Sequence, residues 1–140
     1  MRTLTILALV ATATSASMAN ADAITAITPA ALDWVETPEG VAFADLHGTR
    51  MSEPYMSMVR LPGGTVSPPH IKSANMFGVM ISGTMTHMSA TAADAGTPLG
   101  AGAFYLVPAN LPHVSSCVST EPCITFLYQD GAFDFLPVDQ

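Results

Sequence analysis

Residues 63–83, GGTVSPPHIKSANMFGVMISG, are the most informative part of the chain for its fold, and residues 100–113, GAGAFYLVPANLPH, have the same character. In both stretches, strand-forming residues are interrupted by glycine and proline, which is typical of short β-strands joined by turns. Each stretch also carries one histidine directly after a proline, His70 in the first and His113 in the second. We therefore expect both histidines to lie within or beside strands.

Short apolar runs also fill the rest of the chain after residue 21. Several runs alternate in polarity, and no segment keeps the period of an amphipathic helix for three turns. Residues 29–34 are long enough for one helical turn, and residues 89–99 are expected to form a loop. Many short strands with regular breaks favour one domain built as an antiparallel sandwich or barrel. The predicted strands are residues 41–46, 55–61, 76–81, 84–88, 103–107, 114–118 and 124–128, with 133–138 as a last candidate.

The first 21 residues have the features of a secretory signal peptide. Arg2 supplies the positive start, residues 4–10 form an apolar run, and Ala19-Asn20-Ala21 is a small-x-small cleavage site. The apolar run is shorter than the roughly 20 residues that span a bilayer, and no other stretch is long enough. The sequence therefore predicts a signal peptide at residues 1–21, a mature domain at residues 22–140, and a location in the periplasm or outside the cell.

The charge balance argues against polyanionic partners. The chain has 4 basic and 11 acidic residues, for a formal net charge of −7. Arg2 would leave with the signal peptide, so the mature chain would keep only Arg50, Arg60 and Lys72 as basic residues. Nucleic acid and anionic membrane surfaces would be repelled.

The two cysteines are expected to form a disulfide. Export would place Cys117 and Cys123 in an oxidising compartment. They flank residues 118–122, a predicted turn between two strand-forming runs, and equal steps from Thr120 make them cross-strand neighbours. A pair of free thiols is the alternative, and a Cys-Cys metal site is disfavoured because no other thiol or nearby histidine completes it.

The first stretch resembles the first consensus motif of the cupin superfamily, a group of small β-barrels that usually hold a metal. That motif runs Gly, five residues, His-x-His, three or four residues, Glu, six residues, Gly. Here Gly64, His70 and Gly83 match the motif. Lys72 stands at the second histidine position and Met76 at the glutamate position, so half of the usual ligands are replaced.

The second stretch resembles the second cupin motif, which runs Gly, five residues, Pro-x-Gly, two residues, His, three residues, Asn. Gly102, Pro108 and His113 match. Asn110 replaces the last glycine, which is a mild change because asparagine tolerates the left-handed backbone region. Cys117 replaces the final asparagine.

The resemblance implies an all-β, single-domain antiparallel barrel of the jelly-roll type, and a homodimer by analogy with the family. It also implies that His70, Met76 and His113 face one cavity as metal ligands. Lys72 would occupy the remaining ligand position, and the simplest expectation is that it faces solvent at the rim of the barrel. Otherwise it would line the cavity.

The implied donor set favours copper. Two neutral imidazoles and a thioether form a fairly soft set, whereas Fe(II) oxygenases and Mn(II) sites rely more on carboxylate or further histidine ligands. Zinc, nickel and iron are the alternative metal ions, less favoured than copper. Met80 shares strand parity with Met76, and His87 lies in a second His/Met group, so both are candidates to extend the site. Methionine is also a common core filler, and His87 and His47 are each compatible with an ordinary surface or hydrogen-bonded role.

Three functions remain open at this stage. The favoured one is an exported copper carrier, buffer or sensor. The second is a metal-dependent enzyme, such as an oxygenase or isomerase acting on a small organic molecule. The third is a metal-free module that binds a small ligand in the cavity. The sequence contains no nucleophile elbow, phosphate loop or zinc-finger spacing that would point elsewhere.

Overall fold

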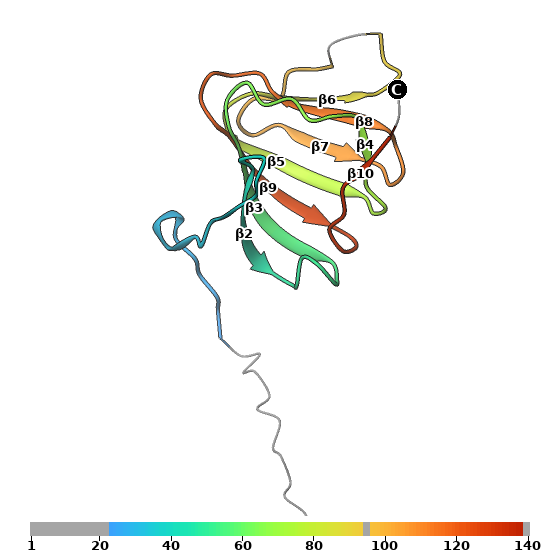
Figure 1. Cartoon of the computed structure of the whole chain (residues 1–140). Helices are drawn as coiled ribbons and strands as arrows, with labels where there is room; N and C mark the ends of the chain where they lie inside the picture. The colour runs from blue at the N-terminus through green and yellow to red at the C-terminus, as the bar shows by residue number, and fades with distance from the viewer. Residues whose placement is uncertain (1–22, 94–95, 139–140) are drawn as a thin grey trace, which may run out of the picture.

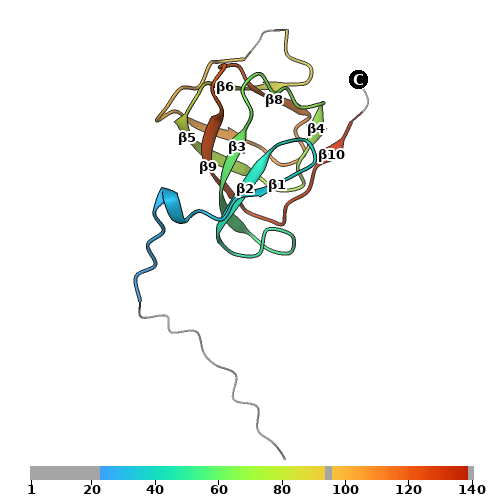
Figure 2. The same cartoon turned by 60° about the vertical axis from the view of Figure 1, so that its left-hand side comes forward.

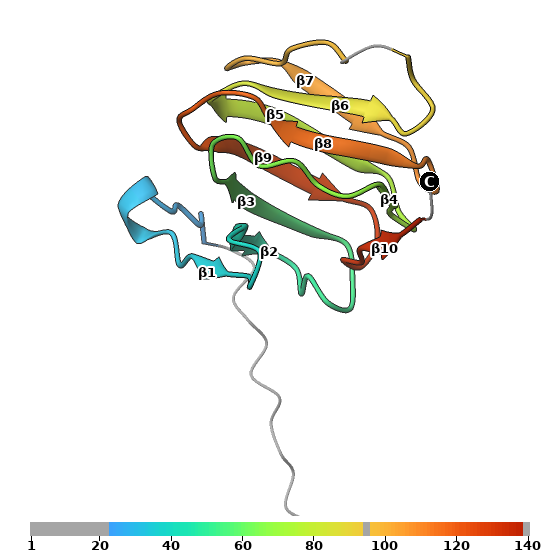
Figure 3. The same cartoon turned by 45° about the horizontal axis from the view of Figure 1, so that its top comes forward.

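The fold consists of two antiparallel β-sheets that pack face to face (Figures 1 and 3). The computed structural model describes residues 23–93 and 96–138, so the predicted signal peptide at residues 1–21 lies outside the described residues. The larger sheet has the order β1-β2-β3-β9-β5-β7, and the smaller has the order β10-β4-β8-β6. The predicted antiparallel all-β architecture is confirmed. The elements are η1 (Pro29–Ala31), β1 (Val35–Glu36), β2 (Ala42–His47), β3 (Tyr55–Leu61), β4 (His70–Ile71), β5 (Met76–Ser82), β6 (Met85–Ser89), β7 (Phe104–Val107), β8 (His113–Cys117), β9 (Cys123–Gln129) and β10 (Leu136–Pro137).

Most strand boundaries fall within one residue of the predicted runs. The differences lie in the shortest elements: β1 and β4 have two residues each and were not predicted, and the last candidate run contains only the two-residue β10. The helical turn expected at residues 29–34 is the 3-10 turn η1, which Figure 2 shows to one side of the sheets before the chain enters β1. No helix among the described residues is long and apolar enough to cross a membrane.

Alternating burial shows which face of each long strand points into the core. In β3 and β9 every second residue is buried, from Tyr55 to Leu61 and from Cys123 to Gln129. The two strands pair in register along their whole length, and β9 also pairs with β5. The inward side chains of the larger sheet therefore form one continuous wall that faces β4, β6 and β8.

Gly78 in β5 makes room for the ring of Tyr105 in the neighbouring β7. The two residues are register partners, and a Cβ at Gly78 would overlap the Tyr105 ring. The ring lies inside the fold, where the Tyr105 hydroxyl is 3.0 Å from Oγ1 of Thr125. Asn110 has a φ of 61°, so this residue adopts the left-handed conformation that the cupin motif assigns to glycine.

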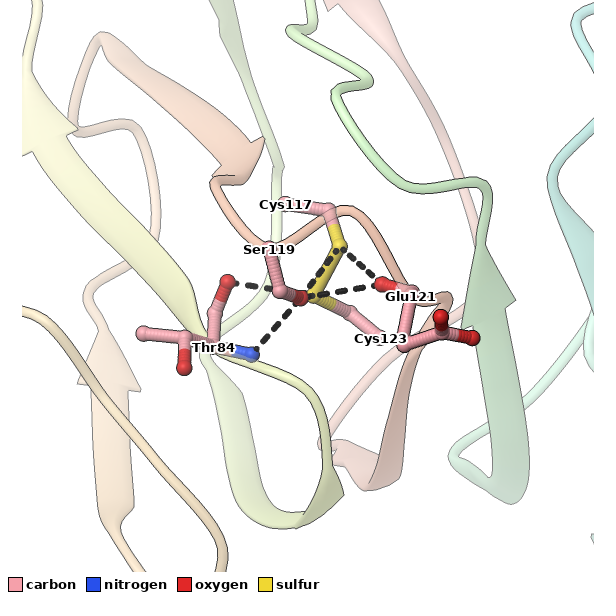
Figure 4. Close-up of a disulfide and its surroundings, with 5 residues drawn as sticks. All are labelled: Thr84, Cys117, Ser119, Glu121 and Cys123. Carbon is pink, nitrogen blue, oxygen red and sulfur yellow. Dashed lines mark hydrogen bonds between the residues drawn. A yellow bond between two sulfur atoms is a disulfide. The ribbon is translucent and has the colours of Figure 1, made fainter.

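A disulfide joins the two sheets. Cys117 ends β8 in the smaller sheet, Cys123 begins β9 in the larger one, and their Cα atoms are 5.7 Å apart. Figure 4 shows Ser119 between them: its hydroxyl donates to the carbonyl of Glu121 (2.9 Å) and accepts from the N–H of Thr84 (3.1 Å). Both cysteines are fully buried, so this covalent link is part of the core.

Candidate functional site

An open cavity of about 760 Å³ is lined by residues of both sheets and of the segments that connect them. Its wall is mainly apolar, with Val59 and Leu61 from β3 and Leu127 from β9. The polar exceptions include His70, Lys72 and His87, which are three of the residues that the sequence singled out. Met76 also lines the cavity, whereas His113 is not among the lining residues and lies beside the ring of His70.

His70 and His113 meet inside the fold. They are register partners in the pair of strands β4 and β8, and their ring centroids are 4.2 Å apart. Only 3% of His70 and 1% of His113 is exposed. The short strand β4 holds this arrangement, because it pairs with β8 through this single residue pair while β10 flanks its other edge.

Backbone carbonyls set the tautomer of both rings. Nδ1 of His70 lies 2.9 Å from the carbonyl oxygen of Pro68, and Nδ1 of His113 lies 2.9 Å from that of Leu111. Since a carbonyl oxygen only accepts, each Nδ1 must carry the hydrogen, and the lone pair is left on Nε2. Nε2 of His113 is buried and has no hydrogen-bond partner. Fixing Nδ1 in this way is the usual means of presenting Nε2 as a ligand.

His87 joins the same group from β6. It is the register partner of Ser115, which lies two residues beyond His113 on the same face of β8, and its Nδ1 is 2.9 Å from the Ser115 hydroxyl. Its ring centroid is 6.3 Å from that of His113 and 4.3 Å from that of Tyr105. Nε2 of His87 is also buried without a partner. An ordinary surface position, one of the two expectations for His87, is not what the structure shows, whereas His47 is exposed.

All three histidines are held neutral at neutral pH. The pKa values of His70 and His87 are lowered from 6.5 to about 4, mainly by burial and with a smaller contribution from the neighbouring histidines, while the hydrogen bond to Pro68 opposes the shift at His70. Burial likewise lowers the pKa of His113, although the hydrogen bond to Leu111 opposes this effect. A neutral imidazole keeps its lone pair, so none of these residues would have to release a proton before binding an electrophile or a metal ion.

The two candidate methionines have different positions. Met76, at the glutamate position of the motif, is 7% exposed and lines the cavity from β5, in the sheet opposite the histidines. Met80 is 1% exposed and packs in the hydrophobic core without forming part of the cavity wall. Met85, which precedes His87 in β6, does line the cavity. The structure thus places one thioether from each sheet on the cavity wall.

Lys72 does not face solvent, so that expectation is wrong. Its side chain is 5% exposed and lines the cavity, and its ammonium donates to the backbone carbonyl of Asp134. Its Nζ is 4.0 Å from the ring centroid of Phe133 and 5.3 Å from that of Phe135. Burial lowers the pKa of Lys72 to about 8, while the charge of Asp134 opposes the shift.

Sequence reasoning missed the role of residues 133–135, which cover Lys72 and His70. The ring of Phe135 stacks on that of His70 with a centroid distance of 4.0 Å and an interplanar angle of 18°. The only signal was an aromatic, apolar run near the end of the chain, which we expected to be a strand. Nothing in the local pattern indicates that this run folds back over His70.

The donor atoms suit a soft transition metal, although they do not form a conventional cluster. Among residues 23–93 and 96–138, no group of three or more His, Cys, Asp or Glu side chains is arranged to hold a metal ion. The three histidines His70, His87 and His113 therefore do not form such a group. The expected set of His70, Met76 and His113 contains only two such residues, because methionine is the third donor. The buried Nε2 atoms of His87 and His113 have no hydrogen-bond partner among the described residues, and such unpartnered polar atoms need an explanation. A bound metal ion would provide one.

Comparison of the sequence with known protein families gives a match to a cupin-like family. The sequence matches the family model described as the ChrR Cupin-like domain over residues 22–133. No curated protein sequence is significantly similar to the chain.

Several solved structures have the same fold at low sequence identity. The polyketide cyclase RemF from Streptomyces resistomycificus is 13% identical, with a TM-score of 0.66 over 84% of this chain and 87% of that chain. KdgF from Halomonas sp. is 14% identical, with a TM-score of 0.61 over 77% of this chain and 94% of that chain. A chain in the complex of Rhodobacter sphaeroides SigE with the anti-sigma ChrR is 19% identical, with a TM-score of 0.59 over 74% of this chain and 52% of that one. At these identities the likeness shows the fold alone.

Proposed function

The chain belongs to the family of ChrR cupin-like domains within the cupin superfamily, and within this fold we propose that its cavity binds a transition metal ion, with copper preferred. The protein would act as an exported carrier, buffer or sensor, and the metal ion would be its cargo. The proposed ligands are His70, Met76 and His113, with His87 as an additional imidazole.

One observation carries this proposal: three neutral imidazoles from three strands gather in one group, two of them with an unpartnered, buried Nε2. Buried polar atoms are normally hydrogen-bonded, so unpartnered ring nitrogens in the interior point to a ligand. The preference for copper follows from the type of donor. Imidazole and thioether suit copper, and the thioether of Met76 replaces the carboxylate that harder metals prefer.

Export is part of the proposal. The disulfide between Cys117 and Cys123 supports it, because such bonds persist mainly outside the cytoplasm. The match to the family model begins at residue 22, directly after the predicted cleavage site. Expression with the full leader in a bacterial host should therefore yield a periplasmic protein whose mass corresponds to cleavage after Ala21. An uncleaved protein in the cytoplasm would contradict this part of the proposal.

We also propose a homodimer formed through the outer face of the larger sheet. Register pairs place Phe104 beside Val79 and Leu106 beside Phe77 on this face, and both β7 residues are about half exposed. Met56 and Tyr128 continue the apolar face across β3 and β9. A second copy is the occupant that this face suits best, because the residues named on it carry no charge and two acidic chains can pack apolar side chains there.

Metal content measured after growth tests the central part of the proposal. The mature protein is purified without chelator from cells grown with copper, iron, manganese, nickel and zinc, and its metals are quantified by mass spectrometry. We expect copper near one equivalent per chain in the wild type, and at least about a tenfold loss in the double variant H70A/H113A. Iron or manganese near one equivalent would instead indicate the metal-dependent enzyme. Protein that stays metal-free in this medium would contradict the proposal.

A further inference from the structure

The cavity contains a buried cation with which no carboxylate of the described residues forms a direct ion pair. Lys72 is 5% exposed and lines the cavity wall. Among residues 23–93 and 96–138, the ion pair is that of Arg50 with Asp45, and no carboxylate of these residues pairs with Lys72. A charge removed from water in this way is unfavourable unless a group of opposite sign compensates it.

The charge of Asp134 favours the ammonium through space, but no carboxylate oxygen of Asp134 pairs with it. Asp134 offers Lys72 only its backbone carbonyl. Its two carboxylate oxygens instead accept the N–H of Ser73, at 3.2 and 3.1 Å. An ammonium has three donor hydrogens, and this contact uses one of them. Two N–H groups therefore remain for a partner in the cavity.

The side chains around Lys72 indicate that the remainder of the ligand is apolar and small. The Phe133 ring lies 4.0 Å from Nζ, and Phe135 bridges the space between Lys72 and the ring of His70. Val59, Leu61 and Leu127 supply further apolar wall. The volume of about 760 Å³ falls within the range of about 300–1,000 Å³ that is typical of sites for small organic ligands.

We propose that the cavity binds a small organic acid whose carboxylate pairs with Lys72 and whose apolar body packs against Phe133, Phe135 and the aliphatic wall. An inorganic anion would pair with the ammonium but would leave the apolar side chains of the wall without a contact. A neutral apolar molecule would pack against these side chains but would leave the ammonium unpaired. This inference goes beyond metal binding and does not depend on it, because it rests on Lys72 and the apolar wall alone.

The test compares an acid with its neutral isostere on metal-free protein. The mature chain is treated with EDTA, and binding of 4-phenylbutyrate and of 4-phenylbutyramide is measured by calorimetry at pH 7. We expect the acid to bind at least about tenfold more tightly than the amide, because a desolvated charge pair is worth that much or more. Inorganic phosphate at the same concentration should not displace the acid.

Two charge-removing variants locate the effect. Lys72→Met should bring the affinity ratio of acid to amide close to one, and Lys72→Arg should keep the preference for the acid. Arg60→Met is the matched control: Arg60 stacks on the ring of Trp34, outside the cavity wall, and its loss should leave the ratio unchanged.

Three results would overturn the inference. They are equal affinity of the wild type for acid and amide, binding of neither compound at millimolar concentration, and displacement of the acid by equimolar phosphate. The comparison of acid and amide affinities for the wild type tests the inference even if Lys72→Met fails to fold. Because no metal is present in the assay, the result is also independent of the outcome for copper.

Discussion

The three clustered histidines determine how this fold responds to acid. His70 and His113 are buried, His87 is partly buried, and each is held in its neutral form, with the pKa of His70 and of His87 lowered to about 4. In the unfolded chain the same side chains titrate near 6.5. Between these two values the unfolded state binds protons that the folded state does not, so folding stability depends on pH.

We predict that the metal-free protein loses stability as the pH falls from 7.5 to 4.5. The contribution of the histidines is fully present above about pH 6.5 and is lost as the pH falls towards 4, at a cost of about 1–3 kcal/mol for each buried ring. Urea unfolding at both values measures the change. The variant His87→Leu should lose less stability than the wild type, whereas His47→Ala, at an exposed position, should behave like the wild type. Identical losses in the wild type and His87→Leu would show that the cluster does not titrate as described.

Lys72 shows where residue-level reasoning from sequence ends. The motif correctly identified its position next to the site, but not its orientation. That orientation depends on residues 133–135, whose rings and carbonyl cover it from a segment about sixty positions later in the chain. Local polarity favours a solvent-facing lysine, and only the long-range contact reverses this preference.

Among the elements, β8 and β9 carry the strongest constraint on how the sheets meet. They belong to different sheets and are joined by the turn between Cys117 and Cys123 and by the disulfide itself. The same strand β8 carries His113 at its other end. The covalent link therefore closes the end of the fold opposite to the histidine group.

Removing the disulfide is predicted to destabilise the protein by about 2 kcal/mol, because the bond closes a short loop and restricts the unfolded chain only modestly. The double variant Cys117→Ala/Cys123→Ala should unfold at lower temperature than the oxidised wild type. Adding a reductant should lower the melting temperature of the wild type and leave the variant unchanged. A reductant effect of equal size in both proteins would show that the loss does not come from this bond.

The longer elements could be predicted from sequence, and the shortest could not. Strands such as β3, β5 and β9 have alternating patterns of seven residues, so their boundaries were close to correct. The strand β4 has only two residues and follows two prolines, so it has no pattern of its own, and it exists because it pairs with β8 and β10. The pairing of His70 with His113 was thus available only through the resemblance to the cupin motifs.

For the molecule as a whole, the outer face of the larger sheet is expected to mediate dimerisation. We predict that Phe104→Lys converts a dimer into a monomer, because two copies of the new charge would face each other across an apolar interface. Light scattering coupled to size-exclusion chromatography measures the mass. Met51→Lys is the control, since Met51 is also an exposed apolar residue but lies outside this face. A wild type that is monomeric at high micromolar concentration would contradict the proposal.

The account depends most on the claim that His70 and His113 bind one metal ion in the interior of the fold. Competitive titration of the mature protein with Cu(I) and a chelator of known affinity tests this claim most directly. We predict one Cu(I) per chain, affinity at least about tenfold weaker in His70→Ala and in His113→Ala, and wild-type affinity in His47→Ala. Equal affinity in the wild type and in both site variants, each shown to be folded, would contradict it.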